Sequence, residues 1–415
     1  MNKCKLGDLF YIKQGYAFQS RKYVSQSPYI LCTLGNFSES NSFKFNFEKA
    51  TYYPDDFSHE FILQEGDLII PLTEQVVGLF GNTAFVPKTN NFQFVLNQRV
   101  GKIIPYDGKA DKAFLHYLLS AQSVRDQIEA TASGTKQRNT SPDKIYDVTV
   151  WVPCIEVQKA IGKCLYRLEQ KCNINARICS ELEALAKTLY DYWFVQFDFP
   201  DENGKPYRTS GGEMVWNEQL KREIPKGWKT GNLYDIANFF NGIACQRFRP
   251  SENEDGLPVI KIKEMHDGIT NDTEFVTENI PEKNKVFDGD ILFSWSATLE
   301  VMYWFGGNGG LNQHIFKVVP KGYFSNEYVY EQLSAYIINF VKMAEARKTT
   351  MGHITTDHLE QSRIVLPPEE VISRFTEVAR PLHRKIGQAR QENRELTKLR
   401  DWLLPMLMNG QARVE

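Results

Sequence analysis

The sequence predicts an α+β fold made of two β-rich heads, each followed by a long helix, with an internal pseudo-two-fold repeat. Three observations predict this fold. Four motifs occur twice in the same order, short β-branched runs follow a Gly-Asp turn in each half, and a heptad pattern of apolar residues closes each half. Because two apolar stripes in one chain can bury each other, we expect the long helices to pair as an antiparallel coiled coil.

The repeat is the strongest signal in the chain. Residues 6–17 recur as 233–244, 66–70 as 289–293, 96–105 as 311–320 and 143–153 as 357–367. The offset between the copies falls from 227 residues (233 − 6) at the first motif to 214 (357 − 143) at the last. Insertions therefore lie between the motifs, and loops of different length on a common scaffold are where two binding modules would differ in specificity.

These motifs divide the chain into five segments. We expect the first head at residues 1–153, a central helix at 154–197, a linker at 198–229, the second head at 230–367 and a C-terminal helix at 368–415. Within the heads, strands are expected at 67–70, 100–104, 290–293 and 315–319, and helices at 114–130 and 326–346. The linker is polar and rich in turn residues, which is typical of a connector.

Both long helices are predicted from apolar residues spaced alternately four and three apart. The expected seam includes Leu165, Leu168, Leu182, Leu189, Leu382, Ile386, Leu396 and Leu403. Each seam also holds one asparagine, and Arg400 fits the pattern least well. Pro381 lies inside the second helix, so we expect that helix to bend there or to become regular only near it, because an interior proline costs ~3 kcal/mol. The alternative to a coiled coil is that each helix packs only on its own head.

Composition excludes several classes of protein. No run of 18 or more apolar residues is present, so no membrane span is expected. Seven cysteines without a CxxC pair indicate neither a zinc site nor a disulfide framework, and with no signal-peptide core at the start they favour a reducing cytoplasm. The formal net charge of −2 lacks the basic excess of a typical nucleic-acid binder. A DNA-binding role would therefore need the basic residues to gather on one face.

Several separated segments resemble the specificity subunits of Type I restriction-modification systems, over nearly the whole chain. Residues 182–187 (LEALAK) and 192–195 (YWFV) resemble the end of that family's central helix, and residues 399–410 resemble its C-terminal ending. Residues 224–228 (IPKGW) look like its lead-in to a head, and Ser133-Gly134 followed by Asp143 and Pro153 resembles its head-to-helix junction. The second junction, residues 347–353 (RKTTMGH), lacks the Ser-Gly start.

The resemblance implies a DNA reader without a catalytic centre, metal or cofactor of its own. Each head would be a target recognition domain for one half of a bipartite, asymmetric site in double-stranded DNA. The helices would set the gap between the half-sites and dock two methyltransferase (modification) subunits. Those partners would bind S-adenosylmethionine and methylate adenine at N6, and separate restriction (motor) subunits would use ATP.

A reader of this kind needs cations for phosphates and amide, hydroxyl or guanidinium groups for base edges. The candidates in the first head are Lys13, Gln14, Gln19, Arg21, Lys22, Thr73, Gln75, Arg99, Lys136, Gln137, Arg138 and Asn139. Those in the second head are Gln246, Arg247, Arg249, Lys261, Lys263, Ser294, Ser296, His314, Arg347, Lys348 and Thr349. For any single residue, ordinary solvated surface charge is an equally good interpretation.

The repeated Leu-Asn-Gln triplet favours a different role. Residues that select different targets should differ between the heads, so Asn97-Gln98 and Asn312-Gln313 are predicted to be structural, with hydrogen bonds to a turn. The next residue differs, as arginine in one head and histidine in the other. Arg99 and His314 are therefore candidates to read bases.

Three other functions are alternatives to DNA reading. A methyltransferase is suggested by residues 305–309 (FGGNG), but a strand rather than a helix is expected to follow, so the segment is predicted to be a hairpin turn. A metal nuclease is suggested by Asp143, Glu169 and Lys171, but the last two are expected to be solvated flanks of the heptad helix. A coiled-coil scaffold that binds only protein is the third alternative.

Overall fold

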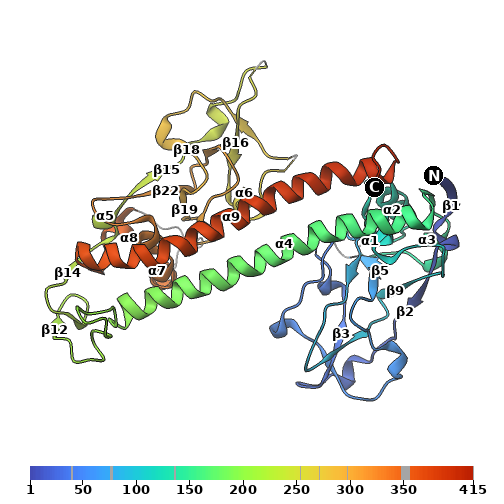
Figure 1. Cartoon of the computed structure of the whole chain (residues 1–415), viewed down its shortest axis with the longest axis horizontal. Helices are drawn as coiled ribbons and strands as arrows, with labels where there is room; N and C mark the ends of the chain where they lie inside the picture. Colours follow the sequence, from blue (N-terminus) through green and yellow to red (C-terminus); the bar gives the residue numbers. More distant parts are fainter. Residues whose placement is uncertain are drawn as a thin grey trace. The chain divides into compact units, whose positions relative to one another are not determined.

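A computed structural model describes residues 1–38, 41–74, 78–134, 137–252, 254–270, 272–296, 298–346 and 356–414. The chain forms two compact units, Met1–Lys171 with Leu396–Glu415, and Cys172–Glu395. The boundary passes through both long helices, α4 (Ile155–Tyr190) and α9 (Glu369–Met408). Each unit contains one β-rich head, and the mixed α and β content confirms the predicted α+β class (Figure 1).

The first head is built on an antiparallel sheet with strand order β2-β9-β5-β7. Its strands are β2 (Phe10–Gln14), β9 (Val100–Pro105), β5 (Leu68–Pro71) and β7 (Ala84–Phe85). A second sheet pairs β4 (Tyr52–Tyr53), β3 (Tyr29–Cys32) and β8 (Gln93–Leu96), with β3 parallel to β8. Two strand pairs complete the head: β1 (Asn2–Lys5) with β11 (Thr149–Val152), and β6 (Thr73–Glu74) with β10 (Arg138–Asn139).

The second head repeats this plan in strand order β15-β22-β19-β20. The strands are β15 (Ala237–Asn241), β22 (Ile315–Pro320), β19 (Ile291–Ser294) and β20 (Glu300–Tyr303). Its second sheet contains β17 (Phe275–Val276), β16 (Leu257–Ile260), β21 (Gly309–Leu311) and β18 (Lys285–Val286), again with one parallel pair, β16 with β21. The pair β14 (Lys229–Gly231) with β23 (Ile364–Leu366) corresponds to β1 with β11. The strands expected after the Gly-Asp turns and from residues 100 and 315 are therefore confirmed.

Short helices complete both heads. The first head has α1 (Lys112–Ser120), α2 (Gln122–Ala130), α3 (Pro142–Tyr146), η1 (Leu6–Asp8), η2 (Ser20–Lys22), η3 (Leu34–Asn36), η4 (Phe47–Lys49) and η5 (His59–Phe61). The second has α5 (Leu233–Ile236), α6 (Ile262–Asp267), α7 (Asn326–Ala346), α8 (Thr356–Glu360), η7 (Cys245–Arg247) and η8 (Glu282–Asn284). The single helix expected at 114–130 is two helices, because Ala121 has extended backbone dihedrals and starts a new turn.

The repeated motifs have structural explanations. Asp8 and Asp235 each cap the turn before the first sheet strand, and their carboxylates accept hydrogen bonds from the backbone N–H of Lys5 (2.9 Å) and Asn232 (2.8 Å). The aspartates of the two Gly-Asp turns each bind a lysine on the neighbouring strand. Their pairs are Asp67 with Lys102 at 2.6 Å and Asp290 with Lys317 at 2.7 Å.

The linker is more ordered than a turn-rich connector. Residues 214–225 form a hairpin of β12 (Met214–Asn217) and β13 (Arg222–Pro225). The rings of Phe199 and Trp228 stack with their centroids 5.1 Å apart, and both side chains are buried in the core of the second unit. Aromatic residues at the two ends of this segment therefore anchor it, although the sequence between them is polar.

Pro381 does not delimit the second long helix. Helix α9 runs from Glu369 through Pro381 to Met408, so the expectation that it becomes regular only near Pro381 is wrong. The residues before the proline explain this, because Phe375 and Ala379 are fully buried in the core of the second unit. Their burial offsets the ~3 kcal/mol that a proline costs inside a helix.

Seam residues of the two long helices lie close together within each unit. In the second unit Cys179 clusters with Ile386, Ala389 and Leu182. In the first unit Leu165 and Leu407 share a core, with Leu403 packed against it. After α4 the chain continues as a π-helix, η6 (Asp191–Val195).

The asparagines of the two seams are hydrogen-bonded to each other. Asn175, which is only 2% exposed, donates to Oδ1 of Asn393 at 2.9 Å and to Glu392 at 2.7 Å. Asn393 in turn donates to the backbone carbonyl of Cys172 at 2.9 Å. This polar contact can form only in one register of the two helices.

Candidate nucleic-acid interface

Several candidate residues of the first head lie at one end of its four-stranded sheet. Strand β2 ends at Gln14, opposite Gly101, and β5 ends at Pro71, opposite Val100. The turn that contains Arg99 therefore lies beside the ends of both strands. Strand β10 joins the same end, since Arg138 and Asn139 pair with Glu74 and Thr73 immediately after β5.

The second head places several of its candidates at the equivalent sheet end. Strand β15 ends at Asn241, opposite Phe316, and β19 ends at Ser294, opposite Ile315. His314 precedes β22 and accepts a backbone hydrogen bond from Trp295 at 3.3 Å. Lys261 follows β16 next to the same turn, because the N–H of Asn312 donates to the carbonyl of Ile260 at 3.1 Å.

A close backbone contact holds this turn in each head. A Cβ atom on Gly15 would lie 2.1 Å from the carbonyl oxygen of Asn97, and one on Gly242 would lie 2.1 Å from that of Asn312. Only glycine fits such an approach. The asparagine side chains accept hydrogen bonds from the backbone N–H of Arg99 (3.2 Å) and His314 (3.3 Å). The structural role predicted for Asn97 and Asn312 is confirmed, and the role predicted for Gln98 and Gln313 stays a prediction.

Four candidate lysines are paired with surface carboxylates. Lys13 contacts Glu60 at 3.0 Å, Lys261 contacts Glu274 at 2.7 Å, Lys263 contacts Asp272 at 3.7 Å, and Lys22 is paired with Asp56. The hydrogen bond and the charge of Lys13 lower the pKa of Glu60, and those of Lys261 lower the pKa of Glu274. Exposed pairs of this kind are weak, so a phosphate could replace the carboxylate.

Arg138 is engaged inside the first head. Its Nη1 lies 2.7 Å from Oε1 of Glu74, whose side chain is 1% exposed, and its guanidinium lies over the ring of Phe80 at 5.7 Å. The other carboxylate oxygen of Glu74 accepts the backbone N–H groups of Leu79 (3.0 Å) and Phe80 (3.2 Å). Arg138 therefore neutralises a buried carboxylate that binds the backbone at Leu79 and Phe80.

Two candidate hydroxyls are also buried. Thr73 is 5% exposed and donates to Asn139 at 2.9 Å, and Ser294 is fully buried and donates to the carbonyl of Ser296 at 3.3 Å. Direct contact with DNA would require these hydroxyls to be uncovered. Gln137, Asn139, Ser296 and His314 are exposed or half-buried.

The remaining candidates are exposed. Arg99, Arg247 and Arg249 have no hydrogen bond or ion pair from their guanidinium groups to any residue that the structure describes. The exposed amides Gln14 and Gln246 lie in the same two regions, and Arg21 bonds only its neighbour Gln19, at 3.0 Å. Gln75, Lys136, Arg347, Lys348 and Thr349 lie outside the described residues.

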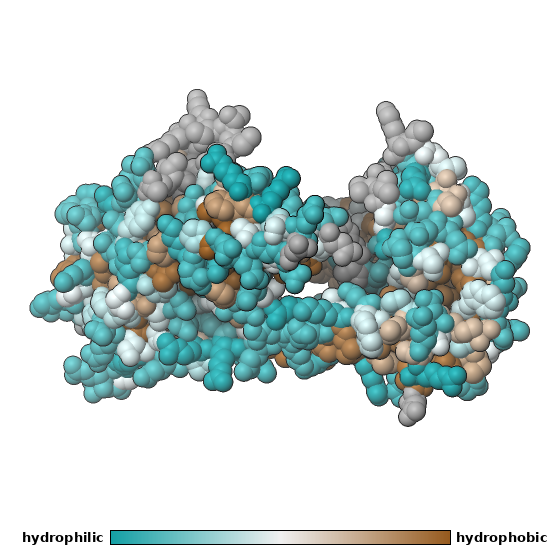
Figure 2. All heavy atoms as spheres, turned by 90° about the horizontal axis from the view of Figure 1, so that it is seen from above, coloured by the Kyte–Doolittle hydropathy of each residue, from teal (hydrophilic) through white to brown (hydrophobic). Residues whose placement is uncertain are grey.

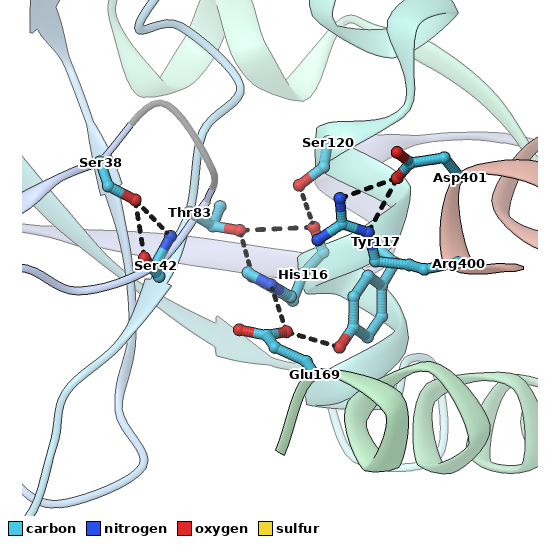
Figure 3. A network of polar contacts seen from close by, with 9 residues as sticks. All are labelled: Ser38, Ser42, Thr83, His116, Tyr117, Ser120, Glu169, Arg400 and Asp401. Carbon is cyan, nitrogen blue, oxygen red and sulfur yellow. Dashed lines mark hydrogen bonds and ion pairs between the residues drawn. The ribbon is translucent and has the colours of Figure 1, made fainter. Parts of the chain in front are cut away.

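A buried polar contact joins the first head to its long helix, and the sequence reasoning missed it. His116 on α1 lies 3.5 Å from Glu169 on α4, and the Tyr117 hydroxyl donates to the same carboxylate at 2.7 Å (Figure 3). Burial alone would raise the pKa of Glu169, but the hydrogen bonds and charge supplied by its neighbours outweigh burial and lower it. Glu169 is 19% exposed, so the expectation of a solvated flank was wrong.

Arg400, the poorest member of the predicted seam, belongs to the same region. It lines a cavity of about 200 Å³ with Glu169, Tyr117 and Asn41, and it pairs with Asp401 at 2.8 Å (Figure 3). Its charge helps to lower the pKa of Glu169. The polar surroundings explain why a seam position holds an arginine.

Other features bear on the alternative functions. Residues 304–308 connect β20 to β21, which belong to different sheets, so the predicted hairpin turn is instead a connection between sheets, and a strand follows it. In the described part of the chain, no three His, Cys, Asp or Glu side chains gather as metal ligands. None of the described helices is long and apolar enough to cross a membrane. Hydrophilic residues cover most of the face seen in Figure 2.

Comparison with known proteins gives a consistent result. A family model described as the Type I restriction modification DNA specificity domain matches residues 1–184 and 225–386. The MjaIX specificity subunit of Methanocaldococcus jannaschii is 24% identical over 77% of this chain and 73% of its own length. The HindI specificity subunit of Haemophilus influenzae is 24% identical over 72% of this chain and 77% of its own length.

A solved structure supports the fold. The S subunit of a Type I restriction-modification system from M. genitalium has a TM-score of 0.59 and 17% identity, over 98% of this chain and 95% of that protein. At this identity the similarity concerns the fold alone. The architecture of two heads and long helices is therefore shared with a known structure.

Proposed function

Because this chain belongs to the Type I restriction-modification DNA specificity family, we propose that each of its heads reads one half of a bipartite, asymmetric DNA site. The observation that carries the proposal is that each head has an equivalent end of its four-stranded sheet. At this end the same backbone turn presents different side chains, with Gln14 and Arg99 in one head and Asn241 and His314 in the other. Different side chains on one scaffold are what two half-sites of different sequence require.

The chemistry of these side chains fits base reading. An arginine can donate two hydrogen bonds to O6 and N7 of guanine, and a glutamine can bond N6 and N7 of adenine. Arg99 is exposed and its guanidinium has no partner among the described residues, so it is available for a base edge. Arg247 and Arg249 are available in the same way in the second head, and the paired lysines would serve phosphates.

We propose further that α4 and α9 pair as an antiparallel coiled coil that sets the gap between the half-sites and docks two methyltransferase subunits. The seam clusters and the bond between Asn175 and Asn393 support the pairing. Large apolar side chains on the outer faces of the helices support docking. Ile174 is 55% exposed on α4 and Trp402 is 58% exposed on α9. Exposed apolar residues on a long helix are typical of a surface that a partner covers.

Co-expression with the cognate methyltransferase subunit, followed by genome-wide mapping of methylated adenine, tests this function. We expect one bipartite motif with a fixed unspecified gap, and exchange of residues 1–153 for another head should change one half of it only. Arg99→Ala should relax one base position of that half, since a bidentate contact contributes about 1–3 kcal/mol of discrimination.

Lys5→Ala is the matched control for Arg99→Ala. Lys5 is an exposed cation of the same head, but it lies on β1, before the other end of β2. This variant should leave the motif unchanged. A stable complex with the methyltransferase but no methylation would favour the scaffold alternative, and loss of both half-sites on exchange of one head would contradict independent reading.

A further inference from the structure

Each head contacts its own long helix through one acid and one buried histidine. In the first unit, His116 and Tyr117 project from α1 toward Glu169 of α4, and Thr83 fixes the other nitrogen of the His116 ring at 2.7 Å (Figure 3). The His116 side chain is 2% exposed. Charged or polar groups at this depth need a complementary partner, because water cannot solvate them.

The second unit has the same kind of contact with different residues. Glu331 of α7 lies 3.4 Å from Nε2 of His383 of α9, and the two side chains are 5% and 7% exposed. The ring of Tyr330 meets the His383 ring edge-on, with centroids 5.6 Å apart. The ring of Tyr303 covers another side of His383, with centroids 5.3 Å apart. Burial is therefore nearly complete on both sides of this pair.

The two contacts occupy equivalent positions on the long helices and neighbouring positions on the head helices, where His116 corresponds to Tyr330 (330 − 116 = 214), and the chemical groups are exchanged. The offset of 214 residues that relates the ends of the two halves takes Glu169 to His383 (383 − 169) and Tyr117 to Glu331 (331 − 117). In the first half the long helix carries the acid and the head helix carries the imidazole. In the second half the long helix carries the imidazole and the head helix carries the acid.

This exchange matters because the chain contains two similar heads and two similar long helices. A head that packed on the wrong long helix, in the same chain or in a second copy, would use an equivalent surface. In that crossed packing Glu331 would meet Glu169, and His116 would meet His383. Two carboxylates buried together repel each other, and so do two protonated imidazoles.

We propose that the exchanged acid and histidine assign each head to its own long helix and reject the other helix. Each correct contact places an acid within 3.5 Å of an imidazole, whereas each crossed contact joins like groups. Specificity of this kind depends on the cost of the wrong pairing as much as on the strength of the right one. The inference rests on the repeat and the two contacts, and it does not depend on which DNA sequence the heads read.

Substitutions in the full-length chain can reproduce the crossed contacts one at a time. His383→Glu places an acid opposite Glu331, as crossed packing would, and His383→Gln is the matched control that only removes the pair. Melting temperature at pH 7 is the readout. We expect His383→Glu to lower it by about 5 °C or more and by at least twice the loss in His383→Gln.

Exchanging the two residues of the pair distinguishes repulsion between like groups from simple loss of the contact. Glu331→His added to His383→Glu restores an acid and an imidazole with exchanged positions, and we expect it to recover most of the lost melting temperature. The cycle of Glu169→His, His116→Glu and both together tests the first unit in the same way. If the second-unit variants do not fold, the first-unit cycle alone tests the proposal. Like-group variants that cost no more than their glutamine controls, or reversed pairs without recovery, would overturn the proposal.

Discussion

The contact between Arg138 and Glu74 leads to a specific prediction, because Arg138 is also a candidate for DNA binding. Among the described residues, Oε1 of Glu74 has no hydrogen-bond partner, and its side chain is 1% exposed, so the Arg138 guanidinium at 2.7 Å is its compensating charge. Arg138→Ala leaves that carboxylate buried and unpaired. Breaking a buried ion pair from one side costs about 3–5 kcal/mol. Because the Arg138 side chain is 26% exposed, we expect the lower end of this range.

The assay is chemical denaturation of the full-length chain, together with binding to a duplex that contains its site. Arg138→Ala should lower the free energy of unfolding of the first unit by about 3 kcal/mol. Glu74→Gln added to Arg138→Ala should recover more than half of that loss. The amide oxygen of glutamine can still accept the N–H groups of Leu79 and Phe80, and no buried charge is left.

The two roles of Arg138 give different results in the double variant. If Arg138 acts only by holding Glu74, affinity for the first half-site should return together with stability. If Arg138 contacts DNA as well, stability should return but affinity should not. An Arg138→Ala variant as stable as the parent protein would refute the reasoning from burial.

Three further predictions concern the helices and the repeat. Replacing both Asn175 and Asn393 by leucine should raise the melting temperature but loosen the register of the two helices, so that methylation mapping finds more than one gap length. A less stable variant with a single gap length would contradict this prediction. The lowered pKa of Glu169 stabilises the fold above pH 4.5, the ordinary pKa of a glutamate, and this stability is lost as the pH falls through the lowered pKa of the folded state. The melting temperature of Glu169→Gln should therefore fall less between about pH 5 and pH 3 than that of the parent protein. Lys102→Met and Lys317→Met should each lower the melting temperature by similar amounts, since both remove an equivalent lysine–aspartate pair, and unequal losses would argue against equivalent roles.

Much of the fold could be predicted because its signals are local. Gly-Asp turns followed by β-branched runs predict the positions of β5 and β19, and the heptad patterns predict both long helices. Errors arose where tertiary packing overrides a local signal. Buried Phe375 and Ala379 carry α9 through Pro381, and buried aromatic residues turn a polar linker into a folded hairpin segment.

The candidate interface was predicted only as a set of residue types. Which cations are paired depends on loops that meet across large sequence distances, as Lys13 meets Glu60, and spacing alone does not predict that. The lysine–aspartate pairs could have been found, because both members of each pair repeat at corresponding positions. Asp67 recurs as Asp290 and Lys102 recurs as Lys317 within repeated motifs.

Comparison of the two halves therefore separates three kinds of position by their physics. A residue kept in both heads and hydrogen-bonded to backbone, such as Asn97 with its copy Asn312, serves the scaffold. A residue that differs between the heads at the exposed sheet end, such as Arg99, is free to meet DNA and to differ with its target. Glu169 belongs to neither kind, because it differs from its counterpart His383 yet contacts a neighbouring helix and is only 19% exposed. A buried difference of this kind cannot be selected by a base sequence, so the constraint on it must come from the helix that it contacts.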